Sequence, residues 1–232
     1  MTKRILISGC SFSQTQSQNT HSVWKPWTDL LEDFYDYSVT NVAISSAGQG
    51  EISERLVSSV INSVNKYDLV IVQWSAIGRG YATNEVDWME RVISTNNLQM
   101  FRNSNEYLNT GLEEHRTSDQ FNEVFDEQYI SSLGKIKLVQ SFLENQNIPY
   151  LFFWGWQQLN DNIYKKHTRL IDSIYTANWW YPNHKFEGML QYILKEIGES
   201  KGISSDGLHP SSEGHNLFFE NIIKNEIQRY LK

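Results

Sequence analysis

Two small residues with nucleophilic side chains follow the first apolar segment of the chain. Residues 5–7 are apolar, and Gly9, Cys10 and Ser11 come shortly after them. A hydroxyl or thiol in a turn after a buried strand can attack an ester carbonyl when a nearby base accepts its proton. The same residues also fit a strand that ends in a polar turn without chemistry, so the rest of the chain must decide between the two interpretations.

A carboxylate and an imidazole lie three residues apart near the other end of the chain. Asp206 and His209 flank Gly207, and Pro210 follows directly. A carboxylate at this spacing can accept the Nδ1–H of the imidazole and leave Nε2 to accept a proton from a serine. Asp-x-x-His alone is common and also fits a helix-capping Asp beside a surface His. Together with Ser11 it gives the order Ser, Asp, His, which indicates nucleophilic acyl transfer.

Strand and helix patterns alternate along the chain and predict an α/β protein. Short apolar runs predict strands at 5–7, 39–44, 68–74 and 148–156. Apolar spacings of three and four predict helices at about 24–34, 52–64, 133–143, 186–197 and 217–231. Such alternation is typical of a parallel sheet between two layers of helices. The loops after its strands form the site, so we expect 9–13, 45–50 and 74–80 at one edge.

Four separated blocks of the chain resemble the SGNH/GDSL hydrolases, in particular divergent members that begin with Gly-Cys-Ser. The blocks are "ISGCSFS", "NVAISSAGQGEI", "DLVIVQWSAIGR" and "DGLHPSSEGH". The resemblance implies a three-layer α/β/α sandwich with a mostly parallel, flavodoxin-like sheet of five strands. It also implies hydrolysis of an ester or acetyl group without a metal or an organic cofactor. In this match Ser11 is the nucleophile, His209 the base, and Asp206 the group that orients His209.

The chain departs from the family pattern in the blocks that supply the oxyanion hole. The second-block glycine, whose N–H stabilises the oxyanion, corresponds to Ser46 or Gly48, depending on the register. In the third block Ile77 stands where the family has an asparagine, and Ser75 and Arg79 are the candidate substitutes. Because loss of one oxyanion donor costs about 10²–10³ in rate, weak or specialised activity stays an alternative.

Cys10 is an alternative nucleophile to Ser11, since a thiolate is intrinsically more reactive than a hydroxyl. Neighbouring residues of a strand point to opposite sides, so only one of the two can face the loop edge. In the family match Cys10 stands where an aspartate is usual, which favours packing beneath the turn. We therefore favour Ser11 as the nucleophile, with its own N–H as a further oxyanion donor.

The composition of the chain limits the cellular locations and the binding partners that we expect for the protein. The 232 residues carry a net charge of −7 with no dense Lys/Arg run, which argues against nucleic acid as a partner. A single cysteine excludes an intrachain disulfide and a multi-cysteine metal site. No apolar run approaches the roughly 20 residues that span a bilayer, and no signal-peptide core is present. We expect one domain over 1–232, no membrane partner, and a cytoplasmic location by default, with export by another route left open.

A polar segment and four tryptophans support a second functional interpretation. Residues 80–128 have weak periodicity and predict an insertion or lid of mixed short helices. With Trp154, Trp156, Trp179 and Trp180 they could form a scaffold that binds a glycan or a protein without turnover. The same tryptophans fit a buried core at the sheet edge.

The principal prediction is a serine esterase or deacetylase that acts on a small-molecule or carbohydrate ester. A flavodoxin-like cofactor binder is disfavoured, because "AGQGE" lacks the Gly-Lys-Ser/Thr ending of a phosphate-binding loop. His215, six residues after His209, is expected to act as a cap or in packing. The sequence predicts neither the acyl group nor the oligomeric state.

Overall fold

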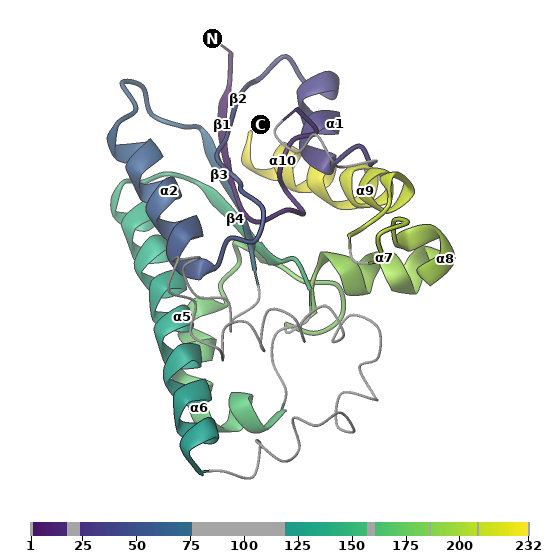
Figure 1. The fold of residues 1–232 in the computed structure, drawn as a ribbon. Helices are drawn as coiled ribbons and strands as arrows, with labels where there is room; N and C mark the ends of the chain where they lie inside the picture. The colour runs from purple at the N-terminus through teal and green to yellow at the C-terminus, as the bar shows by residue number, and fades with distance from the viewer. Residues whose placement is uncertain are drawn as a thin grey trace.

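The structure, a computed structural model, contains a parallel sheet of five strands between two layers of helices (Figure 1). It describes residues 2–17, 24–75, 119–156, 161–185, 187–207 and 209–231. The strand order is β2-β1-β3-β4-β5, and every pair is parallel. The strands are β1 (Arg4–Ser8), β2 (Ser38–Asn41), β3 (Leu69–Trp74), β4 (Tyr150–Trp154) and β5 (Trp179–Trp180). This is the doubly wound order of flavodoxin-like folds, and the predicted fold class is confirmed.

Helices cover both faces of the sheet (Figure 1). On one side lie α2 (Gln49–Ile61), α5 (Asp119–Asn145) and α6 (Asp161–Ile174). On the other side lie α1 (Trp27–Phe34), α7 (Met189–Ile197), α8 (Glu199–Gly202), α9 (Ser212–Phe218) and α10 (Lys224–Tyr230), with the π-helical turn η1 (Phe219–Ile223) between α9 and α10. Within the described ranges, no helix combines the length and the apolar character that crossing a membrane requires.

The strands β1 and β3 lie in the centre of the sheet, and their sequences are continuous apolar runs. All six residues of β3 are buried, and four of the five residues of β1 are buried. A parallel strand covered by helices on both faces has no polar side, so its sequence does not alternate. The register pairs Ile7 with Ile71 and Ser8 with Val72, so both strands end at the same edge of the sheet. The turn that carries Ser11 begins at this edge.

The chain continues beside β1 for a few residues after β2 ends. β2 ends at Asn41, whereas the apolar run predicted a strand to Ile44. The N–H of Val42 still donates to the carbonyl of Ile7, and the N–H of Ile44 donates to the carbonyl of Gly9. The second-block turn therefore lies beside the turn after β1.

Several helix boundaries differ from the predicted ones by a few residues, and two of the differences affect the first helix and the predicted insertion. The first predicted helix begins at Trp27 rather than Trp24, because Pro26 adopts an extended conformation at the N-cap and the residue before a proline is also driven to extended backbone. α5 begins at Asp119, so the last ten residues of the predicted insertion belong to a 27-residue helix. The rest of that insertion, residues 80–118, lies outside the described residues.

Two helices, α6 and the four-residue α8, and one strand, β5, were not predicted. α6 is polar on most of its surface and has a non-helical residue, His167, within it, which interrupts the 3.6-residue period that a sequence pattern reveals. β5 has only two residues, too few for any periodicity.

Candidate active site

A tight turn at the end of β1 presents Ser11. The N–H of Ser13 donates to the carbonyl of Cys10 at 2.9 Å and closes the turn. Ser11 is 5% exposed, and Cys10 is completely buried. The Cys10 Sγ lies 3.2 Å from Oε1 of Gln73, a residue of β3. Cys10 therefore points into the sheet edge, whereas Ser11 points toward the loop before α9.

The loop before α9 carries the carboxylate and the imidazole. An antiparallel bridge between Ile203 and Pro210 closes this loop. Gly207 has a φ of 70°, in the left-handed region that glycine adopts without steric cost. This bend allows the side chain of Asp206 to reach the ring of His209, three residues later.

The structure brings the three residues predicted from the sequence together. The Nε2 of His209 lies 2.8 Å from the Oγ of Ser11, although 198 residues separate them in the chain. On the other side of the ring, Nδ1 of His209 lies 2.6 Å from Oδ2 of Asp206. The second oxygen of Asp206 accepts from the His209 N–H at 3.1 Å and from the Ser204 hydroxyl at 2.5 Å. A serine hydroxyl, an imidazole and a carboxylate in this order can perform nucleophilic acyl transfer.

Two aromatic side chains contact the His209 ring. The Trp24 indole stacks on it with ring centroids 4.6 Å apart and an interplanar angle of 17°. The Phe12 ring makes an edge contact at 5.6 Å and also packs on Trp156 at 5.1 Å. The apolar spacing predicted Trp24 on a helix face, so its contact with His209 was not predicted. Pro26, two residues later, is the signal that places Trp24 before the helix.

Backbone donors near Ser11 come from two turns. Ser46 has a φ of 65°, the left-handed conformation that favours glycine, whereas Gly48 has a φ of −90° at the N-cap of α2. The hydrogen bond from Ile44 to Gly9 fixes the Ser46 turn beside the Ser11 turn. Within the described part of the chain, neither the Ser11 N–H nor the Ser46 N–H has a hydrogen-bond acceptor.

The structure describes only part of the third block, in which Ser75 and Arg79 are the candidate substitutes for the family asparagine. Ser75 is completely buried at the end of β3, and its carbonyl accepts from Nε2 of Gln49 at 2.5 Å. Gln49 is the first residue of α2, so this bond ties the second-block turn to the end of β3. Ile77 and Arg79 lie outside the described residues, and the substitute role of Arg79 stays a prediction.

The four tryptophans do not form an open stacking platform. Trp154, Trp156 and Trp179 are at most 6% exposed, and Trp180 is half-buried. The interpretation as core aromatics at the sheet edge fits these positions. The described tryptophans therefore offer little stacking surface to a glycan.

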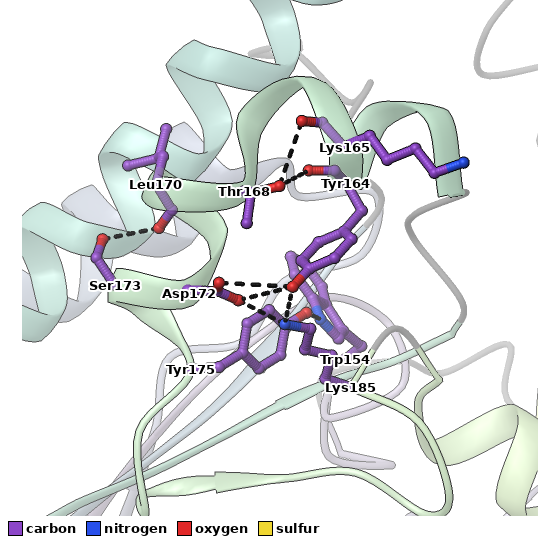
Figure 2. Close-up of polar contacts among 9 residues, drawn as sticks. All are labelled: Trp154, Tyr164, Lys165, Thr168, Leu170, Asp172, Ser173, Tyr175 and Lys185. Carbon is purple, nitrogen blue, oxygen red and sulfur yellow. Dashed lines mark hydrogen bonds and ion pairs between the residues drawn. The ribbon is translucent and has the colours of Figure 1, made fainter.

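A lysine outside the candidate site joins two segments that flank the last strand (Figure 2). The Nζ of Lys185, in the loop between β5 and α7, donates to Asp172 at 2.5 Å and to the Tyr164 hydroxyl at 3.0 Å, both on α6. It also lies 4.1 Å from the centroid of the Tyr164 ring. Beneath it, the indole N–H of Trp154 donates to the Tyr175 hydroxyl at 2.6 Å. Burial is the main cause that raises the pKa of Tyr175, so this hydroxyl remains protonated.

His215 is buried beneath the candidate site. Its Nδ1 accepts from the backbone N–H of Trp27 at 3.3 Å, which joins α9 to the start of α1. Burial, with a smaller contribution from His209, lowers the pKa of His215 to about 3. The ring is therefore neutral near neutral pH, as a packing role requires.

Comparisons with known proteins find solved structures with a similar fold. No protein-family model matches the sequence, and no curated protein matches it. The structure is similar to that of a psychrotrophic esterase, EstA from Pseudoalteromonas sp., with a TM-score of 0.55 at 14% identity over 99% of this chain and 98% of that one. It is also similar to TesA, with a TM-score of 0.54 at 15% identity over 99% of this chain and all of the other. The three-layer fold that the SGNH/GDSL resemblance implied is confirmed.

Proposed function

We propose that this protein is a serine hydrolase that cleaves an ester or acetyl group through an acyl-enzyme. The observation that carries the proposal is the chain of contacts from Ser11 Oγ through His209 to Asp206, at 2.8 Å and 2.6 Å. A small-molecule or carbohydrate ester is the substrate class. The similarity to EstA, an esterase described in a form inhibited by monoethylphosphonate, supports the choice of reaction.

In the first half-reaction, the Nε2 of His209 accepts the hydroxyl proton of Ser11 while Oγ attacks the ester carbonyl. The tetrahedral oxyanion accepts hydrogen bonds from the N–H groups of Ser11 and Ser46. The imidazolium of His209 then gives its proton to the leaving alcohol, and the ester bond breaks. In the second half-reaction His209 takes a proton from water while the water oxygen attacks the acyl carbonyl. The imidazolium then returns the proton to the Oγ of Ser11 as the bond between Oγ and the acyl group breaks, which releases the acid.

Asp206 performs its role without a change of protonation. Because an ionised carboxylate can only accept hydrogen bonds, its contact with Nδ1 fixes the tautomer in which Nδ1 carries the proton. The lone pair of Nε2 then faces Ser11. The positive charge that forms on the ring during attack lies next to the negative carboxylate, which stabilises it.

The backbone conformation of Ser46 supports one of the two registers for the second block. The family glycine supplies an N–H from this block, and Ser46 adopts the φ that glycine favours. We therefore assign the second-block donor to Ser46 rather than to Gly48. A side chain at Ser46 does not change the N–H that donates.

A fluorophosphonate probe tests the nucleophile directly. We expect covalent labelling of the wild-type protein, with the adduct on Ser11 by mass spectrometry, and no labelling of Ser11→Ala. His209→Ala should lower the labelling rate by about 10³-fold or more, since a triad member is worth several orders of magnitude. Hydrolysis of a panel of aryl acetates and acetylated oligosaccharides should fall in parallel.

Cys10→Ala is the matched control, because it removes the neighbouring nucleophile and leaves the turn in place. It should be labelled at close to the wild-type rate. An adduct on Cys10 would contradict the assignment of Ser11. A folded wild-type protein without any adduct would contradict the enzymatic proposal and favour a binding scaffold with this fold.

A further inference from the structure

A buried glutamine lies directly beneath the turn that carries Ser11. Gln73 is the fifth of the six residues of β3 and is completely buried. Its side chain projects between the ends of β1 and β4 at the carboxyl edge of the sheet. A primary amide in an apolar interior costs free energy unless its polar atoms are hydrogen-bonded. The presence of Gln73 at this place therefore needs an explanation.

The carboxamide of Gln73 is bonded on both sides. Its Oε1 accepts from the backbone N–H of Cys10 at 3.1 Å. The Cys10 thiol and the Ser13 hydroxyl lie 3.2 Å and 3.4 Å from the same oxygen. Its Nε2 donates to the carbonyl of Trp74 at 2.8 Å. The orientation is unambiguous, because the Cys10 N–H can only donate and the Trp74 carbonyl can only accept.

Glycines on both neighbouring strands leave the space for this amide. A Cβ at Gly155, directly after β4, would lie 2.5 Å from the Gln73 Nε2. A Cβ at Gly9, directly after β1, would lie 3.1 Å from the Gln73 Oε1. The carboxamide thus fills a gap that two glycines create at the point where three strands end.

The backbone N–H groups of the turn that carries Ser11 point in different directions. The N–H of Cys10 points inward to Gln73, and the N–H of Ser13 closes the turn on the Cys10 carbonyl. The Ser11 N–H, between them, has no acceptor within the part of the chain that the structure describes. One buried acceptor therefore fixes the direction of the Ser11 side chain and leaves the Ser11 N–H for the oxyanion.

We propose that Gln73 is a positioning residue for the nucleophile: its Oε1 fixes the Cys10–Ser11 segment so that the Ser11 Oγ faces His209 and the Ser11 N–H faces the oxyanion. This inference rests on the proposed serine-hydrolase function. Gln73 does not touch the reacting atoms, so its effect must reach them through the turn. The effect belongs to the chemical step and not to substrate binding.

Gln73→Met tests this role, because it keeps the length of the side chain and removes the amide acceptor. We expect the rate constant for fluorophosphonate labelling of Ser11 to fall about tenfold or more. The kcat for an aryl ester should fall by the same factor, while KM changes less than about twofold. Misplacement of a reacting group by even 1 Å can lower a rate about 10²-fold, so a small displacement of the Ser11 Oγ is enough for a tenfold fall.

Gln73→Glu is the conservative variant. Burial raises the pKa of a carboxyl, and a neutral glutamic acid can accept from the Cys10 N–H and donate to the Trp74 carbonyl. We expect it to recover most of the labelling rate that the methionine variant loses. Failure of this rescue, with the variant folded, would contradict a role that depends on the acceptor.

Gln140→Met is the matched control for a merely structural effect. Gln140 is also buried, at 1% exposure, and its Nε2 donates to Glu144, a neighbour on the same helix α5. This variant should lower the melting temperature and leave the labelling rate and kcat unchanged. All rates are measured at least 15 °C below the melting temperature of each variant.

Gly155→Ala keeps the proposal testable if the methionine variant does not fold. It leaves Gln73 in the chain, but its new methyl group must displace the Nε2. The same fall in labelling and kcat, with KM unchanged, is expected. Wild-type rates in folded Gln73→Met or Gly155→Ala would overturn the inference, while a wild-type protein without labelling at Ser11 would overturn the proposed function itself.

Discussion

At the scale of single residues, both oxygens of the Asp206 carboxylate have assigned hydrogen bonds. One oxygen lies against the His209 ring, and the other accepts from the His209 backbone and from Ser204. The backbone bond closes a small ring within the loop, so the carboxylate cannot turn away from the imidazole it orients. A loop of six residues thereby supplies both the base and the group that orients it.

Trp24 gives a prediction about the other face of the same ring. Its indole stacks on His209 at 4.6 Å, so the imidazolium formed during attack lies against a π face, an arrangement worth about 0.5–1 kcal/mol at exposed sites. Trp24→Leu should therefore lower kcat for an aryl ester about two- to fivefold. Trp24→Phe, which keeps an aromatic face, should lose less.

Trp27→Phe is a suitable comparison for that series. Trp27 is a fully buried core residue whose ring packs on Phe153 rather than on His209. We expect this variant to lose stability, measured as the melting temperature, and to keep its kcat. Equal kcat values for Trp24→Leu and the wild type would show that the stacked ring has no part in turnover.

The three side chains that meet at the candidate site could be predicted at this scale, but not their surroundings. Asp206 and His209 stood out through their spacing of three residues, and Ser11 through its place after the first strand, since a serine, a carboxylate and an imidazole together suggest one reaction. Gln73 is visible in the sequence only as one polar residue in the apolar run "DLVIVQW". Its partners Cys10 and Ser13 are about 60 residues away, so its role depends on strand pairing that the sequence pattern does not give.

At the scale of elements, the loop between β5 and α7 is attached to α6 through Lys185 (Figure 2). Burial alone would lower the pKa of Lys185, but the hydrogen bonds to Asp172 and Tyr164 outweigh it, and the pKa is raised. A raised pKa in the folded state means that the charged lysine stabilises the fold below its ordinary pKa. This stabilisation disappears as the pH rises through the folded-state value.

Lys185→Met should lower the melting temperature at neutral pH by about 2–4 °C, the shift that about 1 kcal/mol causes in a protein of this size. Methionine keeps the apolar stem over Tyr164 and removes the charge. Lys201→Met is the control, because Lys201 is 64% exposed and lies 3.6 Å from Glu213, a surface pair of little value. Equal melting temperatures for the two variants would contradict the attachment.

The accuracy of the fold prediction also varied from element to element for physical reasons. β1, β3 and β4 were predicted because strands buried on both faces are continuous apolar runs. α6 and β5 were missed, since one is polar and interrupted at His167 and the other has two residues. Both lie at the side of the sheet away from Ser11. There Trp179 of β5 packs on Trp154, and Lys185 is hydrogen-bonded to α6.

At the scale of the whole molecule, His215 links stability to pH. Its pKa is lowered to about 3 by burial and by repulsion from His209, whereas the unfolded chain titrates near 6.5. Below pH 6.5 the unfolded state therefore binds a proton that the folded state does not. Stability must fall as the pH decreases through this range, by about 1.4 kcal/mol per pH unit.

His215→Asn tests this linkage. The asparagine Oδ1 can accept the hydrogen bond from Trp27, and the side chain has no proton to gain. The wild type should lose about 2 kcal/mol of unfolding free energy between pH 8 and pH 5 because of His215, measured by urea unfolding, and the variant should lack this loss. Asp29 and Glu32, whose pKa values burial raises, shift stability in the opposite direction in both proteins and cancel in the difference. Parallel stability curves for the two proteins would show that His215 is not held neutral between α1 and α9.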